Sequence, residues 1–154
     1  MKIKIATLNE IYEIECLYQE LFTEMSNLQP KYIKPAKQDV TFIQNTITKT
    51  DSDILIADID NRTVGFLLIQ EATTPPYSCI VEHNYAFIVD IIVGSQYQNQ
   101  GIGSALLCEA KKWAKNRQLD YLELNVLSEN MGAITLYEKQ GFQDMNHTMR
   151  LELA

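Results

Sequence analysis

The segment from Gln98 to Ser104 has residue types that suit the binding of a phosphate group. Gly101 and Gly103 follow a short polar stretch and stand where a helix is predicted to begin. The first N–H groups of a helix have no intrahelical partner and lie at the positive end of its dipole, and glycine lets an anion approach the backbone. The segment therefore predicts a diphosphate site, although Gly-x-Gly before a helix also occurs in simple tight turns.

Two other phosphate-binding motifs do not fit this segment. No Gly-Lys-Ser or Gly-Lys-Thr sequence follows the glycines, which excludes a P-loop. Leu106 stands where a dinucleotide-binding fingerprint needs its third glycine. The segment is therefore neither a P-loop nor a dinucleotide-binding turn.

Asp90 is the first candidate for a catalytic base. It interrupts an apolar run over residues 85–93, and burial among apolar neighbours displaces the pKa of a carboxyl group. A solvated or salt-bridged carboxylate explains the same residue equally well. Glu82 and His83 are the alternative bases, and a water chain is another route for the proton. Asn125 is a candidate for positioning a water molecule or the substrate that gives up the proton.

Tyr137 and Asn130 stand on one face of a predicted helix in the last third of the chain. A phenol can donate one proton to a leaving group, and a side-chain amide can hydrogen bond to a ligand. Each residue also has a purely structural interpretation. By spacing alone Tyr137 fits a core tyrosine, and Asn130 fits the N-cap of its helix.

Hydrophobic periodicity places these residues on one α/β domain that covers residues 1–154. The predicted order is βααβββαβαββ, a single-domain fold with a mixed sheet. Strands are predicted at residues 3–5, 53–60, 64–69, 85–93, 121–126, 142–145 and 148–153. Helices are predicted at about residues 7–25, 39–48, 101–116 and 130–140. A capping box over Thr7 to Glu10 begins the first helix, and Asp60-Asn61 predicts a tight hairpin turn.

The composition excludes several classes of protein. The chain has 154 residues, 46% of them hydrophobic and 21% charged, which is typical of a single globular domain. Its 13 Lys and Arg against 20 Asp and Glu give a net charge of −7, which disfavours nucleic acid as a partner. The apolar runs are too short to span a membrane. Three cysteines without metal-site spacing and an amino terminus without a signal-peptide pattern predict a cytoplasmic protein with no metal.

Two motifs resemble those of the GNAT superfamily of N-acetyltransferases. The first is Gln98-x-x-Gly101-x-Gly103, which follows a predicted strand, and the second is Asn130-x-x-Ala133-x-x-x-Tyr137-x-x-x-Gly141-Phe142. The spacing of the two motifs and the helix and strand between them also agree with that family. The resemblance is close over residues 85–142.

The resemblance implies a role for each matching residue. It implies that the central strands are splayed around acetyl-CoA, with the pantetheine arm paired to the main chain of Ile91, Ile92 and Val93. It implies that the pyrophosphate is held by backbone N–H groups of Gln98, Asn99, Gln100, Gly101, Ile102, Gly103 and Ser104. Asn130 would contact the pantetheine arm, and Tyr137 would protonate the departing thiolate. Residues 98–100 replace the frequent Arg-Gly-Lys of the family, which should weaken long-range attraction for coenzyme A.

The function that we expect is acetyl-CoA-dependent transfer of an acetyl group directly to a primary amine of a small molecule or peptide. The alternative is a non-catalytic acyl-CoA-binding or regulatory module, and a more distant one is a nucleotide-binding protein that uses the same helix end for ATP. The acidic composition weakly favours a cationic amine. We expect no membrane partner, and the sequence is compatible with a homodimer.

Overall fold

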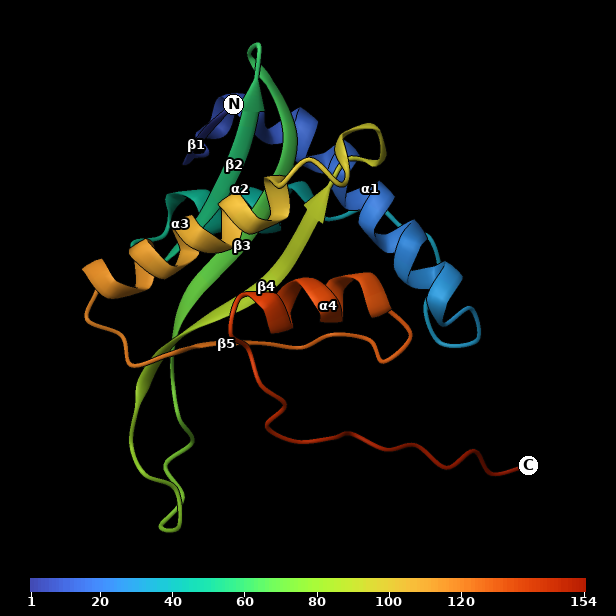
Figure 1. Ribbon diagram of the computed structural model, residues 1–154, viewed down its shortest axis with the longest axis vertical. Helices are drawn as coiled ribbons and strands as arrows, with labels where there is room; N and C mark the ends of the chain where they lie inside the picture. The colour runs from blue at the N-terminus through green and yellow to red at the C-terminus, as the bar shows by residue number, and fades with distance from the viewer.

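A five-stranded sheet in the order β1-β2-β3-β4-β5 forms the centre of the computed structural model, which describes residues 1–154 (Figure 1). The strands are β1 (Lys2–Ile5), β2 (Ser52–Ile59), β3 (Arg62–Thr73), β4 (Asn84–Val93) and β5 (Leu122–Leu124). Neighbouring strands are antiparallel from β1 to β4, whereas β4 and β5 are parallel. The sheet is therefore mixed, as predicted.

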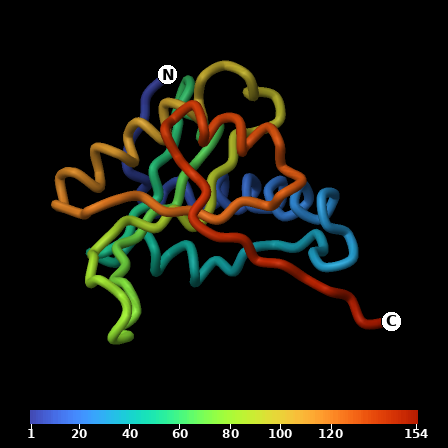
Figure 2. The backbone as a smooth tube through the Cα atoms, turned by 60° about the horizontal axis from the view of Figure 1, so that its bottom comes forward, coloured from blue at the N-terminus to red at the C-terminus, as the bar shows by residue number.

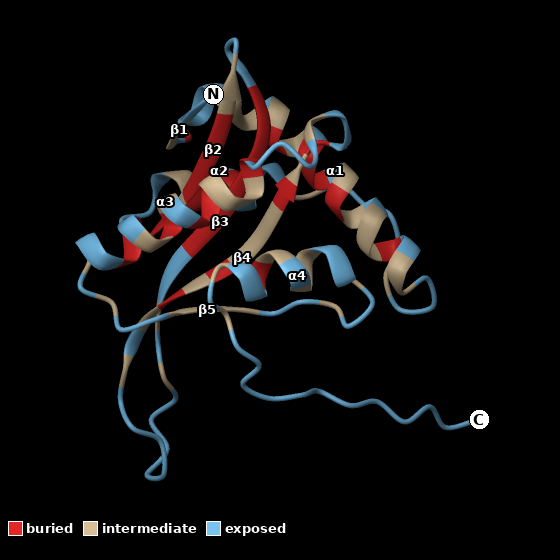
Figure 3. Cartoon of the chain, viewed as in Figure 1, coloured by how far each residue is buried: buried red, intermediate tan, exposed pale blue.

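Four helices cover the two faces of this sheet. They are α1 (Ile11–Leu28), α2 (Val40–Thr48), α3 (Ile102–Asn116) and α4 (Met131–Lys139), with short 3₁₀ turns η1 (Leu8–Glu10) and η2 (Ser95–Tyr97). The buried side chains of α1 and α2 pack on one face in a cluster with Phe66 and Leu68, here called the α1-side core. Those of α3 and α4 pack on the other face with Leu67 and Ile69, the α3-side core. Figure 3 shows that burial is concentrated on β2 and β3, between these layers.

The capping box and the hairpin turn that the sequence predicts are both present. The Thr7 backbone N–H and hydroxyl both donate to Oε2 of Glu10, and the Asn9 N–H donates to the Thr7 hydroxyl, which completes the capping box before α1. Asp60 and Asn61 both adopt left-handed backbone angles, with φ of 52° and 62°, in the turn that joins β2 to β3. A two-residue hairpin loop of type I′ requires a positive φ at both of its residues.

A bulge in β4 decides which way Asp90 points. Leu68 of β3 is paired with Asp90, but the next residue of β3, Ile69, is paired with Ile88, so Val89 is an extra residue. In a regular strand Ile88 and Asp90 would lie on the same face. The bulge reverses the alternation, so that Ile88 packs in the α3-side core whereas Asp90 turns towards α1.

β4 and β5 separate after a short parallel pairing. Their register covers only residues 86–88 of β4 and residues 122–124 of β5. Beyond Ile88, β4 continues to Val93 with β3 as its only partner strand. The central strands are therefore splayed as predicted, and the β5-facing edge of residues 89–93 has no strand beside it.

The two strands predicted at residues 142–145 and 148–153 are absent, and that part of the predicted order is wrong. Residues 140–154 contain no helix or strand, and Figure 2 shows the chain running outward from α4 to its end. The alternation of polar and apolar residues there is compatible with a strand, but a strand also needs a neighbour that accepts its backbone hydrogen bonds. None of the helices is long and apolar enough to cross a membrane.

Candidate active site

A cavity of about 110 Å³ lies where β4 and β5 separate. Its walls are formed by Leu21 and Met25 of α1, residues 88–91 of β4, residues 124–127 at the end of β5 and beyond it, the N-cap Asn130, and Tyr137 of α4. Asp90 therefore lines the same cavity as Asn130 and Tyr137, which lie at least 40 positions later in the sequence.

Asp90 is held by a tyrosine of α1. The hydroxyl of Tyr18 donates a hydrogen bond of 2.6 Å to Oδ2 of Asp90. Burial raises the pKa of Asp90 to about 6, and the hydrogen bond from Tyr18 opposes part of that rise. Burial and the nearby charge of Asp90 together raise the pKa of Tyr18 far above its usual value, so Tyr18 acts only as a donor. Asp90 is thus mostly ionised at neutral pH and has one of its oxygens fixed.

Tyr18 was not among the predicted site residues, although the sequence contains a signal for it. It lies on the apolar face of the first helix, is fully buried, and packs against Phe22 and Phe66 with ring centroids 5.3 and 4.7 Å away. A buried tyrosine hydroxyl needs a hydrogen-bond partner. The partner could not be identified from the sequence because the bulge at Val89 determines which face Asp90 occupies.

Tyr137 forms another wall of the cavity, from α4. Its side chain is 7% exposed and packs edge-on against Phe142, at 5.8 Å between ring centroids. Burial raises the pKa of Tyr137 to about 12, and no charged or hydrogen-bonding neighbour contributes to that rise. The phenol is therefore neutral at physiological pH, and its proton is not committed to a protein acceptor.

Asn130 is the N-cap of α4, as its structural interpretation predicted. Its Oδ1 accepts a hydrogen bond of 3.2 Å from the backbone N–H of Ala133. The side-chain NH₂ group of Asn130 has no such bond and lies beside the cavity. The cap therefore uses only the oxygen of the amide and leaves its NH₂ group without a hydrogen bond.

The start of α3 leaves its first N–H groups without a side-chain cap. Asp39 caps α2 and Asn130 caps α4, but no side chain caps α3. The first helical bond at this end joins the Ala105 N–H to the Gly101 carbonyl oxygen at 3.0 Å, so the N–H groups of residues 102–104 precede it. Gly101 has a φ of 80°, and no heavy atom lies within 4 Å of the position that a Cβ would take. This end of α3 therefore combines unpaired donors with open space.

Gly103 also lies against a side chain of α4. A Cβ at this position would lie 2.9 Å from Cδ2 of Leu136, which belongs to α4. The missing side chain therefore leaves room for the Leu136 side chain. The N–H of Gly103 still lies in the uncapped first turn.

The other candidates for a base lie elsewhere. Neither Glu82 nor His83 lines the cavity, and Nδ1 of His83 is 2.7 Å from Oδ2 of Asp120. Asn125 does line the cavity, next to the end of β5. Among the residues proposed as a base, only Asp90 therefore shares the cavity with Tyr137.

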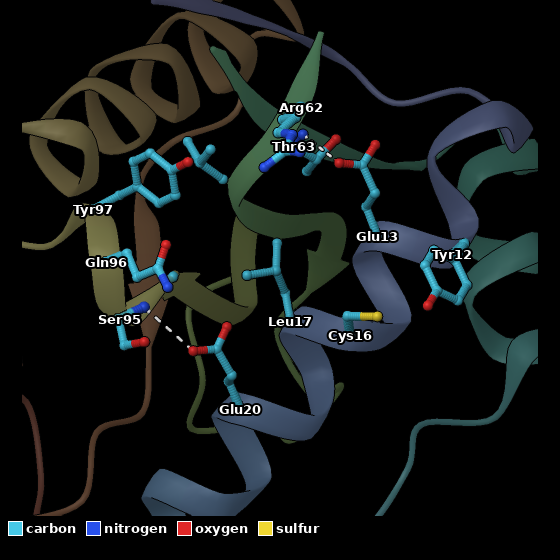
Figure 4. A pocket seen from close by; sticks show the side chains of 12 residues that line it. Tyr12, Glu13, Cys16, Leu17, Glu20, Arg62, Thr63, Ser95, Gln96 and Tyr97 are labelled. Atoms are coloured by element: carbon cyan, nitrogen blue, oxygen red, sulfur yellow. Dashed lines mark hydrogen bonds between the residues drawn. The ribbon is translucent and has the colours of Figure 1, made fainter. Parts of the chain in front are cut away.

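A larger hollow of about 330 Å³ lies between α1, the start of β3 and the turn after β4 (Figure 4). Glu20 there accepts a 3.3 Å hydrogen bond from the Ser95 N–H, and Glu13 accepts one of 2.8 Å from the Thr63 N–H. None of the predicted site residues lines this hollow. The smaller cavity is therefore the candidate active site, because it gathers the residues that can move protons.

The sequence model of the acetyltransferase (GNAT) family matches residues 9–142, which is most of the chain. The chain belongs to the GNAT family of acetyltransferases. This confirms the family that the two motifs resembled. The match includes the uncapped start of α3 and all the cavity residues of this GNAT domain.

Relatives and solved structures agree with the GNAT assignment. L-amino acid N-acetyltransferase AaaT of Escherichia coli is 34% identical over 90 residues, which cover 58% of this chain and 52% of the relative. The chain spans about half the length of the curated relatives it matches. A variant of the BH1408 protein of Bacillus halodurans has a TM-score of 0.94 at 22% identity over 100% of both chains. An aminoglycoside N-acetyltransferase in complex with CoA has a TM-score of 0.74 at 14% identity over 99% of both, so these two structures show a shared fold.

Proposed function

We propose that the protein is an N-acetyltransferase that uses acetyl-CoA and passes the acetyl group directly to a primary amine. The observation that carries this proposal is the cavity between the splayed strands, which both Asp90 and Tyr137 line. A group that accepts a proton and a group that donates one are what direct acyl transfer from a thioester to an amine needs.

The residues around the cavity fit coenzyme A. The unpaired N–H groups at the start of α3, with those of residues 98–101, would hold the pyrophosphate. The free edge of residues 91–93 of β4 would pair with the amides of the pantetheine arm, and the NH₂ group of Asn130 would hydrogen bond to that arm. When bound, acetyl-CoA supplies the activated acetyl group. The CoA complex of the structurally similar aminoglycoside N-acetyltransferase supports this choice of carrier.

Asp90 would act as the base for the acceptor amine. A primary ammonium group must lose a proton before its nitrogen can attack a carbonyl carbon. Oδ2 of Asp90 is held by the Tyr18 hydroxyl, so the second carboxylate oxygen is the one that can receive the proton, directly or through one water molecule. With a pKa of about 6, Asp90 is ionised and also basic enough to share a proton near neutral pH.

Tyr137 would act as the acid for the leaving thiolate. Its pKa of about 12 keeps the phenol protonated throughout the working pH range. The hydroxyl would transfer its proton to sulfur as the carbon–sulfur bond breaks, and the phenol would recover a proton from solvent. The apolar surroundings that raise its pKa also keep bulk water away from the reacting atoms.

The acceptor that we propose is a cationic amine, either a small molecule or a peptide end. The net charge of −7 attracts cations over a distance. Relatives named for L-amino acids and for streptothricin support an acceptor that carries an amine.

The direct test is thiol release from acetyl-CoA in the presence of a panel of amines, compared with acetyl-CoA binding alone. The panel should contain amino acids, polyamines, aminoglycosides and short basic peptides. We expect at least one amine to raise thiol release above hydrolysis and to gain the mass of one acetyl group. Tight acetyl-CoA binding with no acceptor-dependent thiol release would instead indicate a non-catalytic acyl-CoA-binding module.

A further inference from the structure

The larger hollow between α1, the start of β3 and the turn after β4 is not used by the proposed reaction. Its volume of about 330 Å³ is about three times the 110 Å³ of the candidate active site, and no residue lines both spaces. Binding sites for small molecules in proteins usually have volumes of about 300 Å³ or more. The hollow is therefore large enough to hold a ligand of its own.

Thr63, on the wall of this hollow, has a hydroxyl group without a partner. The residue is only 8% exposed and its N–H is bonded to Glu13, but its hydroxyl makes no hydrogen bond within the chain. No polar side-chain atom of the chain is sealed from solvent without a partner, so this hydroxyl reaches open space, and Thr63 lines the hollow. Buried polar groups are normally hydrogen bonded. The hydroxyl of Thr63 is therefore available to a bound molecule.

Two carboxylates of α1 face the same hollow, on either side of Leu17 (Figure 4). Glu13 and Glu20 are seven residues apart, so they lie on one face of the helix, about 10 Å apart along its axis. Glu13 accepts a hydrogen bond of 2.8 Å from the Thr63 N–H, and Glu20 accepts one of 3.3 Å from the Ser95 N–H. The second oxygen of each carboxylate accepts no hydrogen bond. The hollow therefore offers two acceptors to a ligand that carries N–H groups.

The negative charge of the hollow is greatest at Glu20. Arg62 lines the hollow next to Thr63, so a positive charge lies at the Glu13 end. Glu24 follows Glu20 by one helical turn, and burial together with the charge of Glu20 raises the pKa of Glu24. Two carboxylates and one guanidinium group line the hollow, and their net charge is negative. A single positive charge beside Glu20 would balance it.

The surface between these polar groups is apolar. Leu17 and Val64 line the hollow and are both buried, and the partly buried ring of Tyr97 forms another part of the wall. A mostly apolar wall with a few polar groups at fixed positions is typical of small-molecule sites.

We propose that the larger hollow is a second binding site, for a small organic monocation. The primary ammonium group of this ligand donates to Glu20, its apolar body lies across Leu17 and Tyr97, and an uncharged polar group at its other end bonds to the Thr63 hydroxyl. The site is separate from the cavity of Asp90 and Tyr137, and it does not rest on the proposed acetyl transfer.

Tyramine is the probe, because it carries a primary ammonium group and a phenol hydroxyl at opposite ends of an apolar body. Its addition should shift the ¹H–¹⁵N signals of Thr63 and Ser95 until they saturate, since these N–H groups are bonded to the two carboxylates. 4-Ethylphenol, which lacks the ammonium group, should give no saturable shift of these signals. Shifts confined to residues of the smaller cavity, such as Asn125 and Val126, would overturn the proposal.

Glu20→Gln tests the ammonium end of the site. It should raise the dissociation constant of tyramine by at least about tenfold, because a charged hydrogen bond is lost. The amide oxygen of the glutamine can still accept the Ser95 N–H, so the turn keeps its contact with α1. Glu15→Gln is the matched control, since it removes the same charge from the same helix outside the hollow. Equal tyramine affinity in the two variants would contradict the assignment of Glu20.

Thr63→Val tests the other end of the site. It removes the hydroxyl group but keeps the backbone N–H that is bonded to Glu13. The dissociation constant of tyramine should rise by about two- to tenfold, whereas that of 2-phenylethylamine, which lacks the phenol hydroxyl, should stay the same. An equal change for both amines would show that Thr63 does not bond to the ligand. Each of these experiments measures binding alone, so its result is independent of whether the protein transfers acetyl groups.

Discussion

The hydroxyl of Tyr18 and Oδ2 of Asp90 are 2.6 Å apart, although the two residues are separated by 72 positions in the sequence. Tyr18 comes from the buried face of α1, and Asp90 reaches it because the bulge at Val89 turns the carboxyl group to the α1 side of the sheet. The bond fixes one carboxylate oxygen and limits the rise in the pKa of Asp90. Tyr18 is therefore a positioning residue for the proposed base.

Tyr18→Phe should move the acidic limb of the rate profile to higher pH. Removing the donor leaves the burial of Asp90 unopposed, so the pKa of Asp90 should rise above about 6. Activity at pH 6.5 should fall more than activity at pH 8.5, because only the ionised carboxylate accepts a proton. The measurement is kcat/KM against pH. Tyr12→Phe, on the exposed face of the same helix, is the control that should keep the original profile.

Asp90→Asn should change how stability depends on pH. The pKa of Asp90 is raised from 3.8 to about 6 in the folded chain, so the folded state binds its proton more tightly than the unfolded state does. Stability from this group is complete below pH 4 and is lost as the pH rises from 4 to 6. Two pKa units correspond to about 3 kcal/mol. Urea unfolding at pH 4 and pH 7 measures this difference in unfolding free energy, which should be smaller in the asparagine variant. An equal difference in the variant and the parent chain would show that Asp90 is not the group concerned.

Tyr137→Phe should lower kcat by about 10²- to 10⁴-fold, the typical contribution of a general acid. The KM for acetyl-CoA should change little, because the phenol is proposed to act on the leaving group and not on carrier binding. Tyr121→Phe is the comparison, since Tyr121 stacks on Tyr85 outside the cavity. Equal turnover in Tyr137→Phe and the parent chain would remove Tyr137 from the mechanism.

Asn130 offers two substitutions that separate its cap from its proposed ligand contact. Asn130→Ala removes the acceptor for the Ala133 N–H and should cost about 1 kcal/mol of unfolding free energy. Asn130→Asp keeps the acceptor but lacks the NH₂ group, so it should retain stability and weaken CoA binding in titration calorimetry. Equal CoA affinity in the aspartate variant and the parent chain would limit Asn130 to capping.

Gly103→Ala should destabilise the contact between α3 and α4. The added Cβ would lie 2.9 Å from Cδ2 of Leu136, so the end of this side chain must shift, and because alanine favours a helix more than glycine does the net cost should be small, below about 1 kcal/mol. Leu136→Ala in the same chain should recover part of that cost, which a double-mutant cycle by thermal unfolding measures. If the changes in unfolding free energy of the two single substitutions simply add, Gly103 and Leu136 do not interact.

The sequence by itself determined the features that depend on neighbours a few residues away. The capping box of Thr7 and Glu10, the left-handed turn at Asp60 and Asn61, and the cap at Asn130 each close within three residues, so the residue types are sufficient. The two motifs of the α3 and α4 region likewise predicted the family that the comparison confirmed.

Only the tertiary structure decided which distant groups meet. The extra residue at Val89 reverses the face on which Asp90 lies, and such a bulge is visible only in the pairing of β4 with β3. Tyr18 therefore could not be assigned to Asp90 from periodicity. The strand predicted at residues 148–153 is absent for the same reason, since an alternating pattern defines two faces of a strand but does not specify a neighbouring strand. Strand pairing is a contact between segments far apart in the chain, and no local pattern determines its partner.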